Sequence, residues 1–235
     1  GRYSFRRGKL VEQPTTLENM SKAVYSEESK RWRFVQTLDW TRSFGKHDLG
    51  ALVGYEAIRN WGFNTDMAKQ GAADASLTDL STYTELSNIT GTTWENTSRS
   101  FFGRLTYAYK SRYLFEVNAR YDGSSRFAPE SRWGFFPSFS GGWRVSEESF
   151  MQGSPFDNLK IRLSWGKLGN NSIGDYEWQA TYSGSNYIFG DKLTSGLAQT
   201  VIANQKLRWE SVTQTNIGLD FAILNNRLVG EFDIY

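Results

Sequence analysis

Residues 113–144 read YLFEVNARYDGSSRFAPESRWGFFPSFSGGWR, and they carry the clearest structural pattern in the chain. In the first part of this segment, residues 113–122, the odd positions are apolar and the even positions after Leu114 are polar. The same parity resumes after Gly123. A period of two is typical of β-strands with two unlike faces. The segment therefore predicts two strands that share one apolar and one polar face.

The two predicted strands are longer than the ~5–6 residues of an average soluble strand, and aromatic residues lie near both ends of the apolar face. Tyr113 and Tyr121 are about 26 Å apart along a strand at ~3.3 Å per residue, which gives about 20 Å of height at a tilt of ~40°. Outer-membrane barrels have an apolar band of roughly 25 Å bordered by aromatic girdles. A soluble sheet with one face on a core also alternates, but the length and the aromatic placement favour membrane-spanning strands.

The energetics of burial decide which face meets lipid. Turning the even face outward would place Glu116 and Arg120 in lipid, where a basic group costs about 2–4 kcal/mol at the midplane. The polar face is therefore expected to line a lumen, with its charges paired in ladders that are mainly structural and in part available to cargo. The candidate lumen-facing residues are Arg33, Asp39, Glu56, Arg104, Glu116, Asn118, Arg120, Asp122, Arg144 and Asp220. The candidate lipid-facing girdle is Trp32, Trp40, Tyr113, Tyr121, Trp133, Trp143 and Trp165.

The amino-acid composition argues against several classes of function. The 27 basic and 25 acidic residues nearly balance, so nothing indicates nucleic-acid binding. The chain has no cysteine, which excludes disulfides and thiol chemistry within it, and the single His47 is a poor metal ligand. No motif for catalysis, a cofactor or a metal is recognisable. The sequence predicts a protein that is not an enzyme.

Along the chain we expect roughly eight or nine antiparallel strands, the first of them a short one within residues 2–7. Short connections are predicted at 43–46, 110–112, 225–226 and 146–158, the last with a helical turn capped by Ser146. Loops are predicted at 8–30, 60–98 and 169–205, with a weak helical spacing from Leu77 to Leu86. Short turns alternating with longer loops are typical of outer-membrane barrels. The loops at 60–98 and 169–205 are candidates for lid or substrate contact.

The fold class that follows is all-β, a segment of a large transmembrane outer-membrane β-barrel. The chain begins without a leader and ends within a strand, so we expect it to be part of a longer barrel. Two open sheet edges cannot face lipid, hence the strands either close on themselves or continue in a larger barrel.

Three blocks carry a family resemblance: ARYDGSSRFAPESRWGFFPSFSGGWRVSEESF, LKIRLSWGKLGNNSIGDY and LRWESVTQTNIGLDF. They resemble the SusC/RagA family of TonB-dependent outer-membrane transporters over about residues 32–235. The resemblance implies import of a nutrient, usually an oligosaccharide and sometimes a peptide, across the bacterial outer membrane. It also implies a plugged barrel of roughly 22 strands, coupling to the TonB complex through a TonB box, and a SusD-like lipoprotein partner. Neither plug nor TonB box is recognisable in these residues.

The turn DGSSRF, residues 122–127, is a signature of that family, and its simplest role is hairpin closure. Two alternatives remain open at this stage. One is a small complete outer-membrane barrel with a structural or adhesive role, and the other is a soluble, aromatic-rich carbohydrate-binding β-domain.

Overall fold

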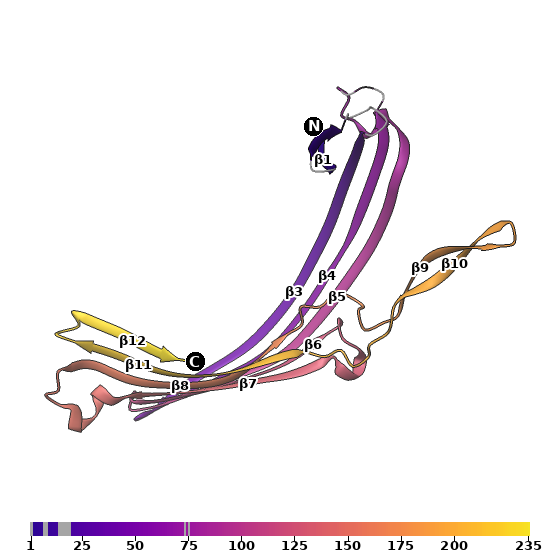
Figure 1. Ribbon diagram of the computed structural model, residues 1–235. Coiled ribbons are helices and arrows are strands. Elements are labelled where there is room, and N and C mark those ends of the chain that lie inside the picture. Colours follow the sequence, from indigo (N-terminus) through magenta and orange to yellow (C-terminus); the bar gives the residue numbers. More distant parts are fainter. Residues whose placement is uncertain (1, 7–8, 14–19, 73, 75) are drawn as a thin grey trace. The chain divides into compact units, whose positions relative to one another are not determined.

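The computed structural model describes residues 2–6, 9–13, 20–72, 74 and 76–235, and the fold is all-β (Figure 1). The strands are β1 (Arg2–Arg6), β2 (Lys9–Gln13), β3 (Ser21–Phe44), β4 (His47–Ala72), β5 (Tyr83–Tyr109), β6 (Tyr113–Ser124), β7 (Trp133–Arg144), β8 (Phe156–Asn170), β9 (Thr181–Phe189), β10 (Lys192–Val201), β11 (Glu210–Ile223) and β12 (Leu228–Ile234). Short 3₁₀ turns are η2 (Leu80–Thr82), η3 (Pro129–Ser131), η4 (Val145–Glu147) and η5 (Ser149–Met151). No helix in the described part has the length and apolar character needed to span a bilayer.

The main sheet has eight strands in the order β12-β11-β8-β7-β6-β5-β4-β3. Consecutive hairpins build it, and the only strands between β8 and β11 form a separate two-stranded sheet, β9 with β10. A third sheet pairs β1 with β2. The predicted antiparallel all-β segment is confirmed. The main sheet is open, with β3 and β12 at its two edges, so the described strands do not form the small closed barrel that was one alternative.

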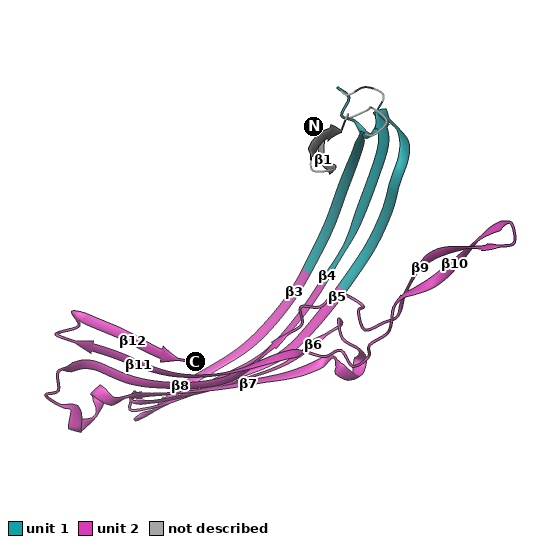
Figure 2. Ribbon diagram, in the orientation of Figure 1, with its two compact units in different colours: residues 1–31, 60–95 teal, residues 32–59, 96–235 magenta. Residues whose placement is uncertain are grey.

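The described residues divide into two compact units, 1–31 with 60–95 and 32–59 with 96–235 (Figure 2). In the first unit the backbone N–H of Gly71, whose φ is +75°, donates to the Met20 carbonyl oxygen at 3.0 Å. The Thr84 hydroxyl donates to the Gly71 carbonyl oxygen at 3.1 Å, and the Gln70 side chain donates to Glu85 at 3.1 Å. These contacts join three strands where the sequence predicted loops.

The loop predictions at 8–30 and 60–98 are therefore wrong for most of their length. β3 already begins at Ser21, β4 continues to Ala72 and β5 begins at Tyr83. The helical spacing from Leu77 to Leu86 yields only the 3₁₀ turn η2. Residues 8, 14–19, 73 and 75 within these predictions, and residue 7 of the predicted first strand, lie outside the described residues. The predicted loop 169–205 contains the β9–β10 hairpin.

In the second unit the short connections of the main sheet are specified by local conformation. Gly45 (φ +62°) turns β3 into β4, and Lys110 and Ser111 (φ 52° and 53°) turn β5 into β6. The predicted two-residue turn at 225–226 is longer, because Leu224, Asn225 and Asn226 all have positive φ. The predicted helical turn after β7 is two 3₁₀ turns, η4 and η5, neither with a side-chain cap. Arg144, and not Ser146, occupies the N-cap position of η4.

Candidate functional site

The apolar residues of neighbouring strands form continuous rows across the second unit. At the short-turn end Tyr109 pairs with Tyr113, and Tyr113 pairs with Trp143; the ring centroids are 6.3 and 6.4 Å apart. Near the other end Phe101 pairs with Tyr121, whose ring stacks on Trp133 at 4.8 Å. Because paired residues of an antiparallel sheet point to the same face, the predicted parity holds across β5, β6 and β7.

The middle of this face is apolar and uncovered. Leu105 pairs with Val117, Val117 with Phe139, and Phe139 with Trp165. Leu105 is 60 % exposed and Phe139 48 %. A soluble protein rarely exposes an apolar surface that extends over several strands. In the described part, the buried apolar residues are few and do not form a core beneath this face.

The predicted girdle residues all lie on the strands of the main sheet. Tyr113 and Trp143 belong to the aromatic row at the short turns, and Tyr121 and Trp133 belong to the opposite row. Trp165 stacks on Phe139 at 5.7 Å, in the middle row instead of at an end. On β3, Trp32 stacks on Phe34 at 6.0 Å and Trp40 is 48 % exposed.

The polar face of the same sheet carries a ladder of predicted residues. Arg33 Nε donates to Glu56, and Arg120 Nη2 lies 3.8 Å from the same carboxylate. Arg120 also pairs with Asp122 at 3.0 Å. The Arg120 guanidinium lies over the Phe102 ring, 5.2 Å from its centroid, and thereby connects β6 to β4 across β5. Four of the predicted lumen-facing residues thus form one network.

Phe102 is a residue that the sequence analysis missed. It is an aromatic side chain at an even, polar-face position of β5, and its ring occupies the space above Gly54, where a Cβ would collide with it. A glycine at position 54 is therefore what allows the ring to lie flat under Arg120. The signal in the sequence was the break of the alternation at two consecutive phenylalanines, 101 and 102.

A second network connects Arg104, Asn118 and Glu116. Arg104 Nε donates to Asn118 Oδ1 at 3.0 Å, and Asn118 Nδ2 donates to Glu116 Oε1 at 2.7 Å. Asp39 lies on β3 without an ion pair among the described residues, and Arg144 lies at the end of β7, where it pairs with Glu147 at 3.4 Å. These two predicted residues do not join the ladders.

A third network surrounds Arg162 of β8, which the sequence analysis did not select. Its guanidinium contacts three carboxylates, those of Asp220 at 2.8 Å, Glu231 and Asp233 at 3.1 Å. Only Asp220 was predicted. The alternation of Lys160, Arg162 and Ser164 in LKIRLSW was the available signal, but the partners come from β11 and β12 and depend on the register of those strands.

Replacing Arg162 with Gln is expected to destabilise the protein, because three carboxylates would then repel one another without a counter-charge. The measurement is the thermal unfolding midpoint of the purified full-length protein in detergent. Salt at about 0.5 M screens exposed charges, so the loss should shrink there. Lys160→Gln is the matched control, since Lys160 lies on the same face of β8 and has no carboxylate partner in the described ranges. An equal, salt-independent loss in both variants would contradict the prediction.

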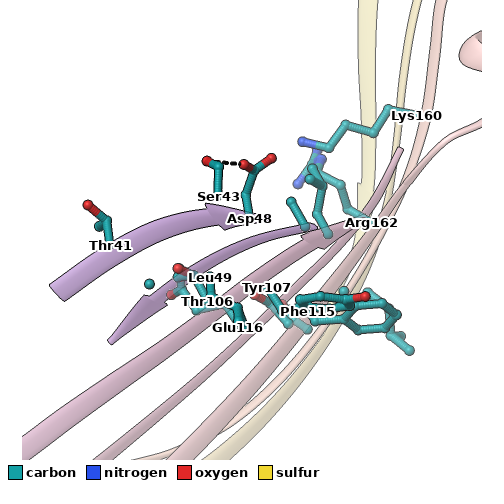
Figure 3. A pocket seen from close by; sticks show the side chains of 18 of the residues that line it. Thr41, Ser43, Asp48, Leu49, Thr106, Tyr107, Phe115, Glu116, Lys160 and Arg162 are labelled. Atoms are coloured by element: carbon teal, nitrogen blue, oxygen red, sulfur yellow. Dashed lines mark hydrogen bonds between the residues drawn. The ribbon is translucent and has the colours of Figure 1, made fainter. Parts of the chain in front are cut away.

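The polar face is hollowed at the short-turn end, where a cavity of about 630 Å³ opens between several strands (Figure 3). Small-molecule sites typically have volumes of about 300–1,000 Å³. In the cavity wall the Ser43 hydroxyl donates to Asp48 Oδ1 at 2.5 Å. The other charged residues on the wall include Arg42, Glu116, Lys160 and Arg162. The wall therefore combines charged groups of both signs and hydroxyl groups with apolar side chains such as Leu49, Phe115 and Leu163.

At the opposite end of the second unit, the DGSSRF turn forms a small buried core. Phe127 and Ala128 are 0 % exposed. The Trp209 ring, from the segment before β11, lies 5.3 Å from the Phe127 ring and 5.2 Å from the Phe136 ring. Trp209 Nε1 donates to the Arg132 carbonyl oxygen at 2.9 Å. The turn is therefore more than a hairpin closure. We call Phe127, Ala128, Phe136 and Trp209 the loop-end core.

Polar contacts attach two further segments to this turn. Ser125 N donates to the Thr97 carbonyl oxygen at 2.9 Å, and Ser125 Oγ accepts from Thr97 N at 2.9 Å. Arg126 Nε donates to Asp175 Oδ1 at 2.8 Å. Asn96 Nδ2 donates to the other oxygen of Asp175 at 3.0 Å. The turn thus holds the middle of β5 and the connection from β8 to β9 together.

The short-turn end has its own anchor in Glu148. Its carboxylate accepts hydrogen bonds from the Tyr113 hydroxyl at 2.7 Å, from Trp143 Nε1 at 3.2 Å and from Arg112 Nη1 at 3.2 Å. These donors hold the pKa of Glu148 below its ordinary value of 4.5, the Tyr113 hydroxyl contributing most. Glu148 therefore attaches the β7–β8 connection to the aromatic row.

Replacing Glu148 with Gln is expected to lower stability at neutral pH only. A carboxyl group whose folded-state pKa is lowered stabilises the fold above its unfolded-state pKa, and this contribution is lost as the pH falls through the folded-state pKa. The unfolding midpoints of wild type and variant should differ at pH 7 and converge below pH 4.5. Glu147→Gln, one residue earlier, is the control. A difference that stays constant down to acidic pH would contradict the assignment.

The family model "TonB dependent receptor-like, beta-barrel" matches residues 1–235. The chain is 37 % identical over 204 residues to the TonB-dependent receptor SusC of Bacteroides thetaiotaomicron, covering 84 % of this chain and 20 % of SusC. It is 35 % identical over 201 residues to the TonB-dependent receptor P3 of Formosa agariphila, covering 84 % and 20 %.

A solved structure, that of the RagAB peptide transporter, matches with a TM-score of 0.79 and 32 % identity, covering 91 % of this chain and 24 % of that chain. The chain spans about a fifth of the length of the curated relatives SusC and P3. The matched family agrees with the open antiparallel sheet and its two unlike faces. The chain belongs to the TonB-dependent receptor-like β-barrel family and is a segment of such a barrel.

Proposed function

We propose that the eight-stranded sheet is part of the wall of a larger outer-membrane barrel, with its apolar rows in lipid and its polar face towards the lumen. The exposed apolar face between two aromatic rows is the observation that carries this proposal. The ladders around Glu56, Asn118 and Arg162 then line the lumen. A plug domain and a TonB box would belong to other parts of a longer protein.

The function that this wall serves is TonB-dependent import of a nutrient across the bacterial outer membrane, and we assign it no catalytic role. An oligosaccharide is the cargo class implied by the resemblance to SusC-type proteins. A peptide is the second candidate, because the matched RagAB structure is that of a peptide transporter at 32 % identity. The cavity at the short-turn end presents charged groups of both signs beside apolar side chains, a mixture that supports contact with a peptide or a sugar inside the barrel.

The partner we propose is a SusD-like surface lipoprotein on the side opposite the short turns. Outer-membrane barrels have short turns on the periplasmic side, so the β9–β10 hairpin, and likewise residues 76–82 of the β4–β5 connection, would lie on the extracellular side. The hairpin is exposed along its whole length; Tyr182 is 61 % exposed and Leu197 77 %. These two segments are the candidates for contact with lid or substrate.

The test uses the full-length gene in its own host. A strain that lacks the gene is grown on single oligosaccharides and on peptides, and the wild-type gene is restored with an affinity tag. We expect growth to fail on one substrate class, restoration by the wild-type gene, and co-purification of a surface lipoprotein from detergent-solubilised outer membranes. Unchanged growth and uptake on every substrate would overturn import. Replacing residues 182–200 by a short turn should reduce uptake or lipoprotein recovery if the hairpin contacts either.

A further inference from the structure

The β9–β10 hairpin is connected to the main sheet by two unlike attachments. Among the strands that the structure describes, β9 and β10 pair only with each other, with Thr181 opposite Val201 at the base of the hairpin. Its outgoing connection, residues 171–180, is held at Asp175. Its returning connection, residues 202–209, ends at Trp209. Both attachments are made to the same short segment, the β6–β7 connection.

The outgoing attachment is ionic and reachable by water. Asp175 binds Arg126 through Oδ1 and Asn96 through Oδ2, and Arg126 Nη1 also donates to the Asn171 carbonyl oxygen at 3.3 Å. The side chains of Arg126 and Asp175 remain 30 % and 18 % exposed. Asn171 adds one bond to Ser124 Oγ at 3.3 Å. Ion pairs that water reaches contribute little stability and weaken in salt.

The returning attachment is aromatic, and it places a partly buried Trp209 against two buried phenylalanine rings. Trp209 lies against Phe127 and Phe136 and donates its indole N–H to a backbone carbonyl. Phe136 is 8 % exposed, and its ring fills the space over Gly169, where a Cβ would collide with it. Separating buried aromatic rings exposes a large apolar area and is costly. The two connections of the hairpin therefore differ in how readily they open.

We propose that the Arg126–Asp175 pair is a releasable latch for the β9–β10 hairpin, and that Trp209 is the fixed point about which the released hairpin moves. With the latch closed, both connections are held on the β6–β7 segment and the hairpin has one orientation. With the latch open, the returning connection stays held at Trp209, whereas the outgoing connection loses its ion pair and keeps weaker contacts such as the Asn171–Ser124 hydrogen bond, so the hairpin gains freedom to move. The latch follows from these contacts alone; only the statement that it acts on the extracellular side rests on the proposed function.

The test measures the position of the hairpin in the purified full-length transporter. Spin labels are placed at Asn186→Cys in β9 and Thr213→Cys in β11, and the distance distribution between them is recorded by pulsed electron paramagnetic resonance. We expect a narrow distribution in otherwise wild-type protein and a broad one in the Asp175→Asn variant. Asp122→Asn is the matched control, because it breaks the Arg120–Asp122 ion pair on the polar face of β6 without touching the hairpin.

A second measurement needs no substitution at the latch. Raising the salt concentration to about 1 M should broaden the distribution of the labelled wild-type protein, because a partly exposed ion pair is screened. A broad distribution in low salt, or a narrow one that neither Asp175→Asn nor salt alters, would overturn the latch. Since the distance is recorded without cargo, failure of the latch and failure of the import proposal are separately visible.

Discussion

The Leu105→Arg variant is expected to be nearly absent from the outer membrane, whereas Thr106→Arg, one residue further along β5, should accumulate as the wild type does. Leu105 lies in the middle row of the apolar face, opposite Val117. A basic residue on the lipid face near the midplane costs about 2–4 kcal/mol, a large part of the 5–15 kcal/mol that typically separates folded from unfolded protein.

Thr106 provides a matched control because it points to the other face of the same strand. It pairs directly with Glu116 and lies in the wall of the polar cavity, where a guanidinium has both space and a carboxylate opposite it. The measurement is the amount of folded, heat-modifiable full-length protein in the outer-membrane fraction. Equal amounts of the two variants would contradict the assignment of the faces, and loss of Thr106→Arg alone would reverse it.

The strands could be predicted from the sequence only where the environment requires apolar and polar residues to alternate along them. Within the predicted membrane band one face must be apolar and the other polar, so Tyr113 to Tyr121 alternate and their strands were predicted. The outer parts of β4 and β5 carry polar residues on both faces and lack this constraint, which is why residues 60–98 were interpreted as a loop. The outer parts of β4 and β5 are strands, but their sequence lacks the alternation of apolar and polar residues by which strands were predicted.

The sequence predicted that charged residues share the polar face, but it did not predict which of them pair with one another. Parity placed Glu56 and Arg120 on one face, yet Arg120 reaches Glu56 by crossing the Phe102 ring on the strand between them. The partners of Arg162 required the register of β11 and β12. Register is fixed by hairpin geometry and pairing across strands, and the length of the β11–β12 turn was itself mispredicted.

The contacts of the loop-end core could not be predicted from local sequence patterns, for a different reason. Phe127 and Trp209 are distant in sequence, and each lies in a segment rich in polar and small residues, where an apolar side chain gives no periodic signal. Their contact depends on the whole of β7, β8 and β11 being in place. The DGSSRF signature could be recognised as a family feature, but its role in joining three connections became visible only in the structure.

Phe127→Ala is expected to lower the free energy of unfolding more than any other single truncation at this end of the sheet. Phe127 is 0 % exposed and its ring lies 5.3 Å from Trp209. Truncating a buried phenylalanine costs about 3–5 kcal/mol, since both the transfer free energy and the packing around the cavity are lost. The measurement is urea unfolding of the full-length protein refolded in detergent, followed by tryptophan fluorescence, to which Trp209 at this site contributes together with the other tryptophans.

Phe150→Ala is the control for Phe127→Ala, since Phe150 lies in η5 and is 68 % exposed. Its truncation should leave the unfolding midpoint almost unchanged. If the loop-end core holds the returning connection, Phe127→Ala should also expose the β9–β10 hairpin to protease at lower urea than the strands of the main sheet. Similar midpoints for the two variants would show that Phe127 does not support this end of the sheet. Protease sensitivity without a midpoint shift would instead mean that the core fixes the hairpin alone.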